Sequence, residues 1–430
     1  MNIDPTRRRA LRAIGRLLFA GLLSLPVLTT AQEQSLSPAG PARLGDWMRA
    51  EVADKKVPGA VLMIWQGGKP AYVEVAGRRD PAQDTPLKVD DIFRIYSMTK
   101  PIVSVGAMML VEEGRLDLDA PVSGYIAAFA DMKLGVETTG ALGQKTLELV
   151  DAPRPMTVRD LLRHTSGLTY GFFGPGLVKQ AYRESGLESA RGIDNAQFAE
   201  RIARLPLAYA PGGTWDYSNS TDVLGRVIEV VSGQPLAAFL QARLFNPLGM
   251  KDTGFSVPET ERQARIAEPF GGDGITPGSA LFDPRRPAAL QSGGGGLMST
   301  APDYARFLLM LRGGGQLDGR RYLGEAALQA MTRDQLGPQV QRTALYLPGP
   351  DYGFGLGFAV RTKSAAPGRD SAVGEYYWGS AAGTYMWVDP ANDLFVVYMM
   401  QSPKQRMPHR AALRERVYGA LTDARQEAPK

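Results

Sequence analysis

A serine and a lysine three positions apart, Ser97 and Lys100, are the residues of this sequence best suited to nucleophilic chemistry. Spaced in this way at the start of a helix, they lie on one face, so the ammonium can reach the hydroxyl. The free N–H groups and partial positive charge of a helix N-terminus favour an oxyanion formed at Ser97. A neutral lysine would serve as the base. Alone the pattern is weak, because such a serine is commonly a helix cap and such a lysine commonly lies in solvent.

A tyrosine and an asparagine further along the chain offer groups that could act with this pair. Tyr217 and Asn219 end a turn-rich stretch before a helix, and such loops can present side chains into a cleft. Being two positions apart, they face the same way if the segment is extended. A tyrosinate or hydrogen-bonded phenol beside Lys100 would share the proton of Ser97, whereas a packed tyrosine in a turn is the structural alternative.

Small residues follow Trp378 and lead into a strand near the carboxyl end. The run Trp378-Gly379-Ser380-Ala381-Ala382-Gly383-Thr384 would let backbone approach a ligand closely. A backbone N–H at the edge of this strand would then be a second oxyanion donor. The same composition is also typical of a tightly packed strand without a catalytic role.

Together and in this order, the three segments resemble the signatures of the serine β-lactamase and penicillin-binding protein superfamily. Tyr217-Ser218-Asn219 resembles the Tyr-x-Asn of class C β-lactamases, D,D-carboxypeptidases and related esterases. Three other stretches also resemble this group: Arg163-His164-Thr165-Ser166-Gly167-Leu168, Pro247-Leu248-Gly249-Met250 and Gly293-Gly294-Gly295-Gly296-Leu297-Met298-Ser299. The resemblance runs from about residue 40 to about residue 400.

The third segment departs from the β-lactamase pattern, because Trp378-Gly379-Ser380 stands where those enzymes carry Lys-Thr-Gly. A tryptophan there is similar to the Trp-Gly-Gly of family VIII carboxylesterases and related acyltransferases. Losing the lysine removes the cation that would hold a substrate carboxylate, and an indole instead offers an apolar wall compatible with neutral esters. Ser380 departs from both versions. By position, the resemblance implies that the oxyanion donors are the N–H groups of Ser97 and Ala381.

The resemblance implies a serine hydrolase that works through an acyl-enzyme, most directly a carboxylesterase on small neutral esters. Ser97 would attack the ester, Lys100 with Tyr217 would accept its proton, and Asn219 would position the substrate or Lys100. Three substrate-binding positions follow from the same match: Trp378, Gly379 and Ser380. No metal or organic cofactor would be required. Two alternatives stay open: a β-lactamase or D,D-peptidase using the same residues, and a binding protein that keeps the fold without catalysis.

Composition narrows the chemistry further. The 430 residues include no Cys and two His, which excludes thiol catalysis and Cys-ligated metals and leaves few ligands for a histidine metal site. His164 could be imagined as the base of a triad, but no Gly-x-Ser-x-Gly elbow occurs, and a histidine beside a helix end is more often structural. His409 lies in a basic, polar tail and is expected to be exposed. The glycines at 293–296 lack the Lys-Ser/Thr of a phosphate loop.

Four aromatic residues near the third segment have two readings. They are core and strand surface, or they form an aromatic acyl pocket: Tyr376, Tyr377, Trp378 and Tyr385. The sequence favours neither reading.

Hydrophobic periodicity predicts the elements that must position these groups. Helices are expected over about 44–52, 98–113, 157–167, 222–232, 236–244 and 300–311, with a carboxy-terminal helix carrying Leu413, Val417 and Leu421 on one face. Strands are expected over 60–66, 71–76, 354–360, 384–388 and 394–401. Thr157 with Asp160 has the spacing of a capping box. Residues 268–296 form a long Gly/Pro-rich loop, of the kind that is usually functional.

Strands at both ends of the chain and helices in its middle indicate an α/β (α+β) fold. We expect an antiparallel sheet built from both termini and flanked by helices, with a mainly helical region inserted. A single domain over residues 32–430 would have its α/β part at about 40–120 and 290–430 and its helical part at about 121–289. No internal repeat or linker is evident.

The first 31 residues have the three parts of a secretory signal peptide: a basic region, the apolar run Leu17–Leu28 and small residues before Ala31. Twelve apolar residues are too few to span about 30 Å of hydrocarbon, so no permanent membrane span is expected. The arginines of Thr6-Arg7-Arg8-Arg9-Ala10-Leu11-Arg12 resemble a twin-arginine leader. Cleavage after Ala31 would give a periplasmic or secreted protein; a retained amphipathic helix is the alternative.

The net charge of +5 also comes mainly from this leader, which holds five Arg and one Asp. The remaining 399 residues contain 44 basic and 43 acidic side chains, so no nucleic-acid or membrane-surface partner is indicated. The expected partner is a small-molecule ester or amide substrate, and the sequence predicts no oligomeric state.

Overall fold

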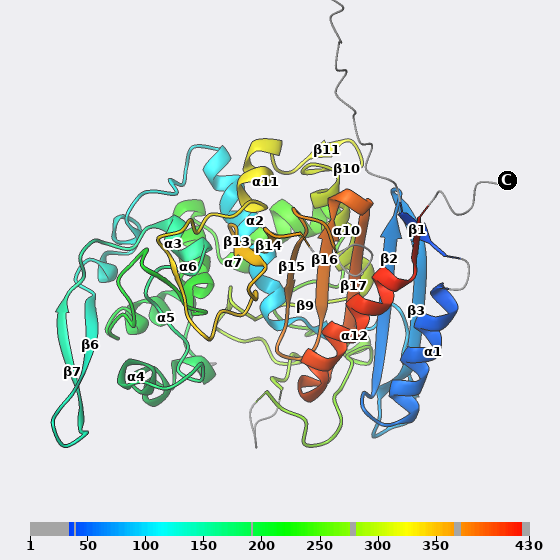
Figure 1. Cartoon of the computed structure of the whole chain (residues 1–430), viewed down its shortest axis with the longest axis horizontal. Helices are drawn as coiled ribbons and strands as arrows, with labels where there is room; N and C mark the ends of the chain where they lie inside the picture. The colour runs from blue at the N-terminus through cyan, green and yellow to red at the C-terminus, as the bar shows by residue number, and fades with distance from the viewer. Residues whose placement is uncertain (1–33, 38–39, 191, 276–280, 365–370, 424–430) are drawn as a thin grey trace, which may run out of the picture. The chain divides into compact units, whose positions relative to one another are not determined.

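The computed structural model describes residues 34–37, 40–190, 192–275, 281–364 and 371–423 (Figure 1). Contacts divide the chain into residues 1–32 and one compact unit of residues 33–430. The leader predicted for residues 1–31 lies outside the described residues.

Twelve helices occur in the described part of the chain, most of them in its middle. They are α1 (Gly40–Ala53), α2 (Thr99–Glu112), α3 (Val158–Leu162), α4 (Leu177–Ser185), α5 (Asn195–Ile202), α6 (Ser220–Ser232), α7 (Leu236–Leu240), α8 (Asn246–Leu248), α9 (Thr260–Gln263), α10 (Ala301–Arg312), α11 (Glu325–Met331) and α12 (Arg406–Gly419). A 3₁₀ turn, η1 (Tyr96–Met98), precedes α2, and a π-helical turn, Gln241–Phe245, continues α7.

The strands fall into one large sheet and several short pairs. Those of the large sheet are β2 (Gly59–Gln66), β3 (Lys69–Asp80), β4 (Thr85–Pro86), β13 (Tyr352–Phe354), β14 (Ala359–Arg361), β15 (Tyr376–Gly379), β16 (Tyr385–Asp389) and β17 (Leu394–Met400). The pairs are β1 (Gln34–Leu36) with β18 (Leu421–Asp423), β5 (Phe93–Arg94) with β9 (Met298–Ser299), β6 (Lys133–Thr139) with β7 (Lys145–Asp151), β8 (Thr214–Trp215) with β12 (Gln341–Arg342), and β10 (Gln316–Leu317) with β11 (Arg320–Arg321).

An antiparallel sheet of eight strands organises the molecule, in the order β13-β14-β15-β16-β17-β2-β3-β4. Its central pairing joins β17, from near the carboxyl end, to β2, from near the amino end, with Val397 opposite Met63. The sheet is thus built from both ends of the chain and carries helices, which confirms the predicted fold class.

Side chains of these strands alternate between two apolar layers, as a sheet covered on both faces requires. In β2, Met63 packs in the larger core cluster, whereas Leu62 packs in the smaller one. In β16, Met386 belongs to the larger cluster and Trp387 to the smaller. The two faces of the sheet therefore have different neighbours, and Trp378 of β15 lies on the face of the larger cluster.

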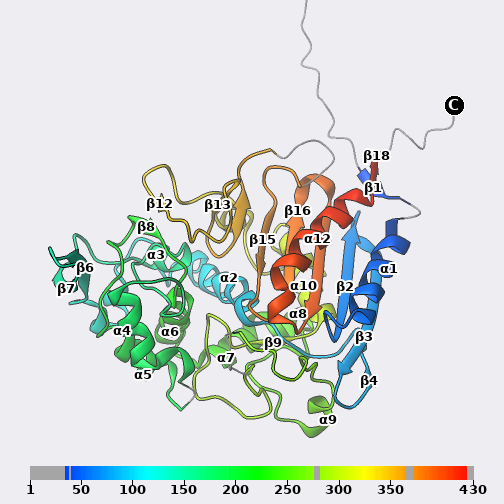
Figure 2. The same ribbon diagram turned by 60° about the horizontal axis from the view of Figure 1, so that its bottom comes forward.

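Helices cover both faces of the sheet (Figures 1 and 2). On one face, Leu44 and Trp47 of α1 pack with Leu413 and Val417 of α12 in the smaller cluster. On the other face, α10 contacts β2 and β17, and α2 leads into the helical part of the chain. In that part, α6 packs against α2, α3, α5 and α7, and the β6–β7 hairpin lies at its edge.

Most predicted elements are present, and the differences have physical causes. The single strand expected over 354–360 is two strands, because the chain turns between β13 and β14, where Gly357 has φ 101°. Leu421 lies in β18 rather than in the carboxy-terminal helix, since α12 ends at Gly419. The β6–β7 hairpin was not predicted; its residues are mostly exposed on both faces, so they show no apolar alternation. The capping box of Thr157 is present at α3.

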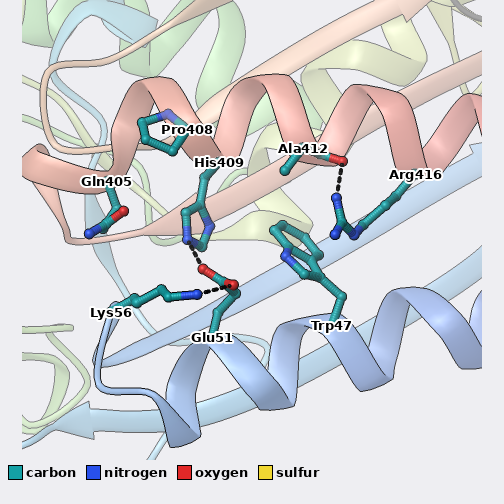
Figure 3. Close-up of a pocket in the computed structure, with 8 residues that line it drawn as sticks. All are labelled: Trp47, Glu51, Lys56, Gln405, Pro408, His409, Ala412 and Arg416. Carbon is teal, nitrogen blue, oxygen red and sulfur yellow. Dashed lines mark hydrogen bonds and ion pairs between the residues drawn. The ribbon is translucent and has the colours of Figure 1, made fainter.

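The prediction that His409 is exposed is wrong, because its side chain is 2% exposed. Its Nδ1 lies 2.9 Å from the hydroxyl of Tyr398, and its Nε2 lies 3.0 Å from the carboxylate of Glu51 (Figure 3). Trp47 of α1 and Arg416 of α12 line the same small pocket between the two helices. Although the residues around it in sequence are basic and polar, His409 is buried and joins α1, α12 and the sheet.

No single helix in the described ranges is long and apolar enough to cross a membrane. One pair, Ser220–Ser232 with Leu236–Leu248, passes that test by length and composition only when both are counted together across a 76° bend.

Candidate active site

Ser97 lies at the point where the chain turns from β5 into α2. It is the middle residue of η1, and Tyr96 before it has a left-handed backbone with φ 37°. Such a conformation costs a non-glycine residue about 1–3 kcal/mol and is found mainly where the surroundings enforce it, often at functional sites. The Ser97 side chain is only partly buried, whereas Met98, Thr99 and Lys100 after it are buried. Ser97 is therefore accessible from solvent, as Tyr96 beside it is, whereas the three residues that follow are not.

Lys100, one helical turn later, is buried with 2% exposure and has defined partners. Its Nζ donates to the carbonyl oxygen of Gly294 at 2.6 Å and contacts the hydroxyl of Tyr170 at 3.2 Å. The same Nζ lies 4.6 Å from the ring centroid of Tyr217. The predicted lysine and tyrosine are therefore in contact, but the Lys100 Nζ lies against the face of the Tyr217 ring and not at its hydroxyl.

The hydroxyl of Tyr217 is buried and has no hydrogen-bond partner in the described ranges. Its ring packs 5.5 Å from that of Trp378, and the indole Nε1 is likewise buried without a partner there. Among described residues, Lys100 is the only cation that makes a hydrogen bond or cation–π contact with Tyr170, Tyr217 or Trp378. The site therefore offers two unpaired polar atoms inside an aromatic wall.

Tyr170 and Gly294 contact Lys100, and Asp222 holds the loop of Gly294; these supporting roles were not predicted from the sequence. Asp222, in the first turn of α6, accepts the N–H of Gly294 at 3.0 Å and the hydroxyl of Ser292 at 2.5 Å. Burial raises the pKa of Tyr170 well above its ordinary value, and the nearby Asp222 carboxylate raises it further. Tyr170 therefore stays a neutral phenol beside the ammonium.

The only sequence signals for this support were indirect. Tyr170 follows two residues after the stretch Arg163–Leu168, and Gly294 belongs to the glycine run considered above for a phosphate loop. The glycines are needed because the loop packs on α6: a Cβ on Gly294 would lie 2.3 Å from a carboxylate oxygen of Asp222. A side chain at 294 would displace the carbonyl that binds Lys100.

The third segment lies beside η1, because β15 packs against that turn. Trp378 of β15 faces Tyr217, while Ser380 accepts hydrogen bonds on its Oγ from the N–H and the hydroxyl of Thr384, at 3.0 and 2.8 Å. The hydrogen bonds of the described residues leave the backbone N–H of Ser97 and that of Ala381 without partners. Both N–H groups are therefore free to act as oxyanion donors.

Asn219 has other partners than Lys100. Its amide nitrogen donates to the carbonyl of Thr169 at 2.8 Å. Burial raises the pKa of the nearby Glu188 carboxyl, and hydrogen bonds from the Gly171 N–H and the Asn219 amide only partly oppose that shift. In this structure Asn219 fastens the start of α6 to the loop that carries Tyr170.

The four aromatic residues near the third segment do not form one pocket. Tyr376 and Trp378 belong to the larger core cluster, Tyr385 belongs to the smaller one on the opposite face, and Tyr377 packs against both. Strand alternation thus leaves only Trp378 of the four in contact with Tyr217.

His164 is a buried neighbour of Tyr217 and not a partner of Ser97 in any hydrogen bond of the described residues. Its ring lies 5.0 Å from that of Tyr217, and its Nδ1 lies 3.2 Å from the hydroxyl of Ser218. Burial, and then the charge of Lys100, lower its pKa well below the ordinary value of 6.5, so the imidazole is neutral. In the described ranges no group of three or more His, Asp or Glu is placed to hold a metal ion.

Comparison with known proteins identifies the family of the chain. Residues 44–419 match the family model described as beta-lactamase. The chain is 34% identical to the esterase EstB of Burkholderia gladioli, over 88% of this chain and 95% of that protein. It is 30% identical to the lovastatin esterase of Penicillium rubens, over 82% of this chain and 91% of that protein.

Solved structures show the same relationship. The structure of EstCE1, a hydrolase with promiscuous acyltransferase activity, superposes with a TM-score of 0.73 at 26% identity, over 89% of this chain and 98% of that one. The resemblance inferred from the three motifs is thereby confirmed: the chain belongs to the β-lactamase family.

Proposed function

We propose that this protein is a serine carboxylesterase that hydrolyses neutral esters through an acyl-enzyme on Ser97. The observation that carries the proposal is the buried Lys100, held by Gly294 and Tyr170 one turn after an accessible serine. Esterases among the relatives support the same reaction class.

In the first step, the hydroxyl oxygen of Ser97 forms a bond to the ester carbonyl carbon, and its proton passes to Lys100, whose ammonium must first have given up one proton to act as the base. The carbonyl electron pair moves onto oxygen, which the N–H groups of Ser97 and Ala381 stabilise. The intermediate collapses by breaking the bond to the alkoxy oxygen, and Lys100 returns the proton to the leaving alcohol. Water then attacks the acyl-enzyme by the same route and releases the acid.

The surroundings of Tyr217 favour a neutral substrate. Trp378 and Phe173 both contact its ring, and Phe172, 51% exposed, stacks on Tyr170. No second cation contacts the rings of Tyr170, Tyr217 or Trp378 in the described ranges, so a substrate carboxylate would be desolvated there without a counter-charge.

The test compares wild-type protein with Ser97→Ala on short p-nitrophenyl esters and on nitrocefin, with products identified by mass spectrometry. We expect ester hydrolysis in the wild type and none in Ser97→Ala, whose thermal midpoint should be nearly unchanged because the side chain is partly exposed. A fluorophosphonate probe should label Ser97. Faster turnover of nitrocefin than of any ester would favour a β-lactamase, and retained ester hydrolysis in Ser97→Ala would place the nucleophile elsewhere.

We also propose that the protein is exported, with cleavage after Ala31. The support is the leader pattern of residues 1–31 described above. Sequencing the amino terminus of the exported protein should give Gln32 as the first residue, and a start at Met1 would contradict the proposal.

A further inference from the structure

Arg410 of α12 lies behind the third motif, on the face of the sheet opposite Trp378. Neighbouring residues of β15 point to opposite faces, so Gly379 faces α12 when Trp378 faces the active site. A Cβ on Gly379 would lie 2.5 Å from Nη2 and 2.6 Å from Cζ of Arg410. The guanidinium therefore packs directly on the Gly379 backbone, which explains why this motif has glycine at its second position.

The guanidinium also binds the next residue. Nη2 of Arg410 donates to the carbonyl oxygen of Ser380 at 2.6 Å, and the N–H of Gly383 approaches the same oxygen at 3.4 Å. Cζ of Arg410 lies 5.3 Å from the ring centroid of Tyr385, and Nη1 lies 3.8 Å from the sulfur of Met407. These contacts hold the cation in one place behind the strand.

The carbonyl of Ser380 and the N–H of Ala381 belong to one peptide unit. In a trans peptide these two bonds point in opposite directions. A carbonyl that points to Arg410 on the α12 face therefore directs the Ala381 N–H toward the face of Trp378, where η1 carries Ser97. Like the N–H of Ser97, the Ala381 N–H has no partner among the hydrogen bonds of the described residues.

We propose that Arg410 is a positioning residue of the oxyanion hole, acting through the Ser380–Ala381 peptide. Its cation fixes the plane of that peptide and polarises it, so the Ala381 N–H becomes a stronger donor to the oxyanion. Hydrogen bonds to an ionised group are roughly twice as strong as neutral ones, and a donor fixed in advance needs no reorganisation during the reaction. The inference rests on the proposed function, because it concerns the charge that forms when Ser97 attacks.

The side chain of Ser380 supports the same peptide from its other end. Its Oγ accepts from the N–H and hydroxyl of Thr384, and its N–H donates to the carbonyl of Thr384 at 2.8 Å. The serine that departs from both family patterns is thus part of the frame that holds the donor, together with Arg410.

The effect should fall on kcat, because the oxyanion carries its charge in the transition state and not in the bound ester. For p-nitrophenyl butyrate we expect Arg410→Met to lower kcat at least tenfold with KM changed less than threefold. Arg410→Lys keeps a cation but loses the planar, forked guanidinium, so its kcat should lie between those of the wild type and Arg410→Met. Inhibition by butylboronic acid, whose tetrahedral adduct on Ser97 places a hydroxyl in the oxyanion hole, should weaken by the same factor as kcat.

Arg416→Met is the matched control, since Arg416 is an exposed arginine of the same helix. Its guanidinium lies 5.0 Å from the Trp47 ring centroid and donates to the carbonyl of Ala412, away from β15. This variant should keep kcat within twofold of wild type. Gly379→Ala is a second route to the same effect, because its methyl would displace the Arg410 guanidinium without removing it.

Two results would overturn the inference. One is a kcat for Arg410→Met equal to that of the control Arg416→Met. The other is a change in KM alone, with kcat and inhibition by the boronic acid unchanged. If Arg410→Met does not fold, as judged by circular dichroism, then Arg410→Lys and Gly379→Ala decide, and wild-type kcat in both overturns it. Failure of the proposed function is distinguishable, because the wild type would then show no hydrolysis that depends on Ser97.

Discussion

The carbonyl of Gly294 is the shortest contact of Lys100, and one added methyl group tests its importance. In Gly294→Ala the new Cβ would lie 2.3 Å from a carboxylate oxygen of Asp222 and 3.0 Å from the hydroxyl of Tyr170. Asp222 is buried in the first turn of α6, so it cannot simply swing away, and the loop must move instead. Movement of the loop takes the carbonyl away from the lysine.

The expected size of the effect follows from these contacts. Forcing an extra methyl group into a packed site costs about 1–3 kcal/mol in the free energy of unfolding. A hydrogen bond to a charged group contributes about 1.5–3 kcal/mol. If that amount is lost in positioning Lys100 for the transition state, the rate falls roughly 10- to 150-fold.

The neighbouring glycine provides the control. A Cβ on Gly295 would meet nothing closer than 3.7 Å, at Tyr96, and neither glycine has a positive φ that an alanine would strain. We therefore expect Gly295→Ala to keep near wild-type kcat/KM for p-nitrophenyl butyrate and near wild-type stability in urea. Equal kcat/KM in the two variants, both shown to be folded, would refute the role assigned to the Gly294 carbonyl.

Two further predictions concern buried ionisable groups. Lys179 and Asp216 form an ion pair of 3.1 Å with side chains 5% and 2% exposed, so Lys179→Met should lower the unfolding free energy in urea by about 3–5 kcal/mol, and adding Asp216→Asn should recover part of it; a cost below about 1 kcal/mol would contradict this. Burial lowers the pKa of His409 although Glu51 opposes the shift, so the unfolded chain takes up a proton more readily and stability falls as pH drops below 6.5. His409→Gln should reduce that fall between about pH 7 and pH 5 in urea titrations, and an unchanged slope would argue against it.

The site residues that the sequence could predict are those that belong to local motifs of recognisable spacing. Ser97 and Lys100 are three apart on one helix, and Tyr217 and Trp378 each lie in a short segment of recognisable composition. The strands β2 and β17 were likewise found because a short, continuous apolar run is a local property of the sequence. Their pairing across the whole chain was an inference from their positions at its two ends.

The supports of these residues could not be predicted in the same way. Gly294 and Lys100 are 194 residues apart in the sequence, and nothing in the sequence around either residue indicates that they are in contact. Arg410 is 30 residues from Ser380 on a helix whose basic composition suggested an exposed tail. Such contacts exist only once the sheet, α2 and α12 are packed, so a single sequence contains no local signal for them.

The third motif shows why its departure from Lys-Thr-Gly concerns more than one side chain. Trp378 contacts Tyr217 at 5.5 Å and Phe354 at 5.4 Å between ring centroids. An ammonium in place of the indole would lie among these rings, where removal from water disfavours a charge that only cation–π contacts would offset. The neighbours of this position therefore favour a neutral residue, and the packing of these aromatic side chains supports the proposed preference for neutral esters.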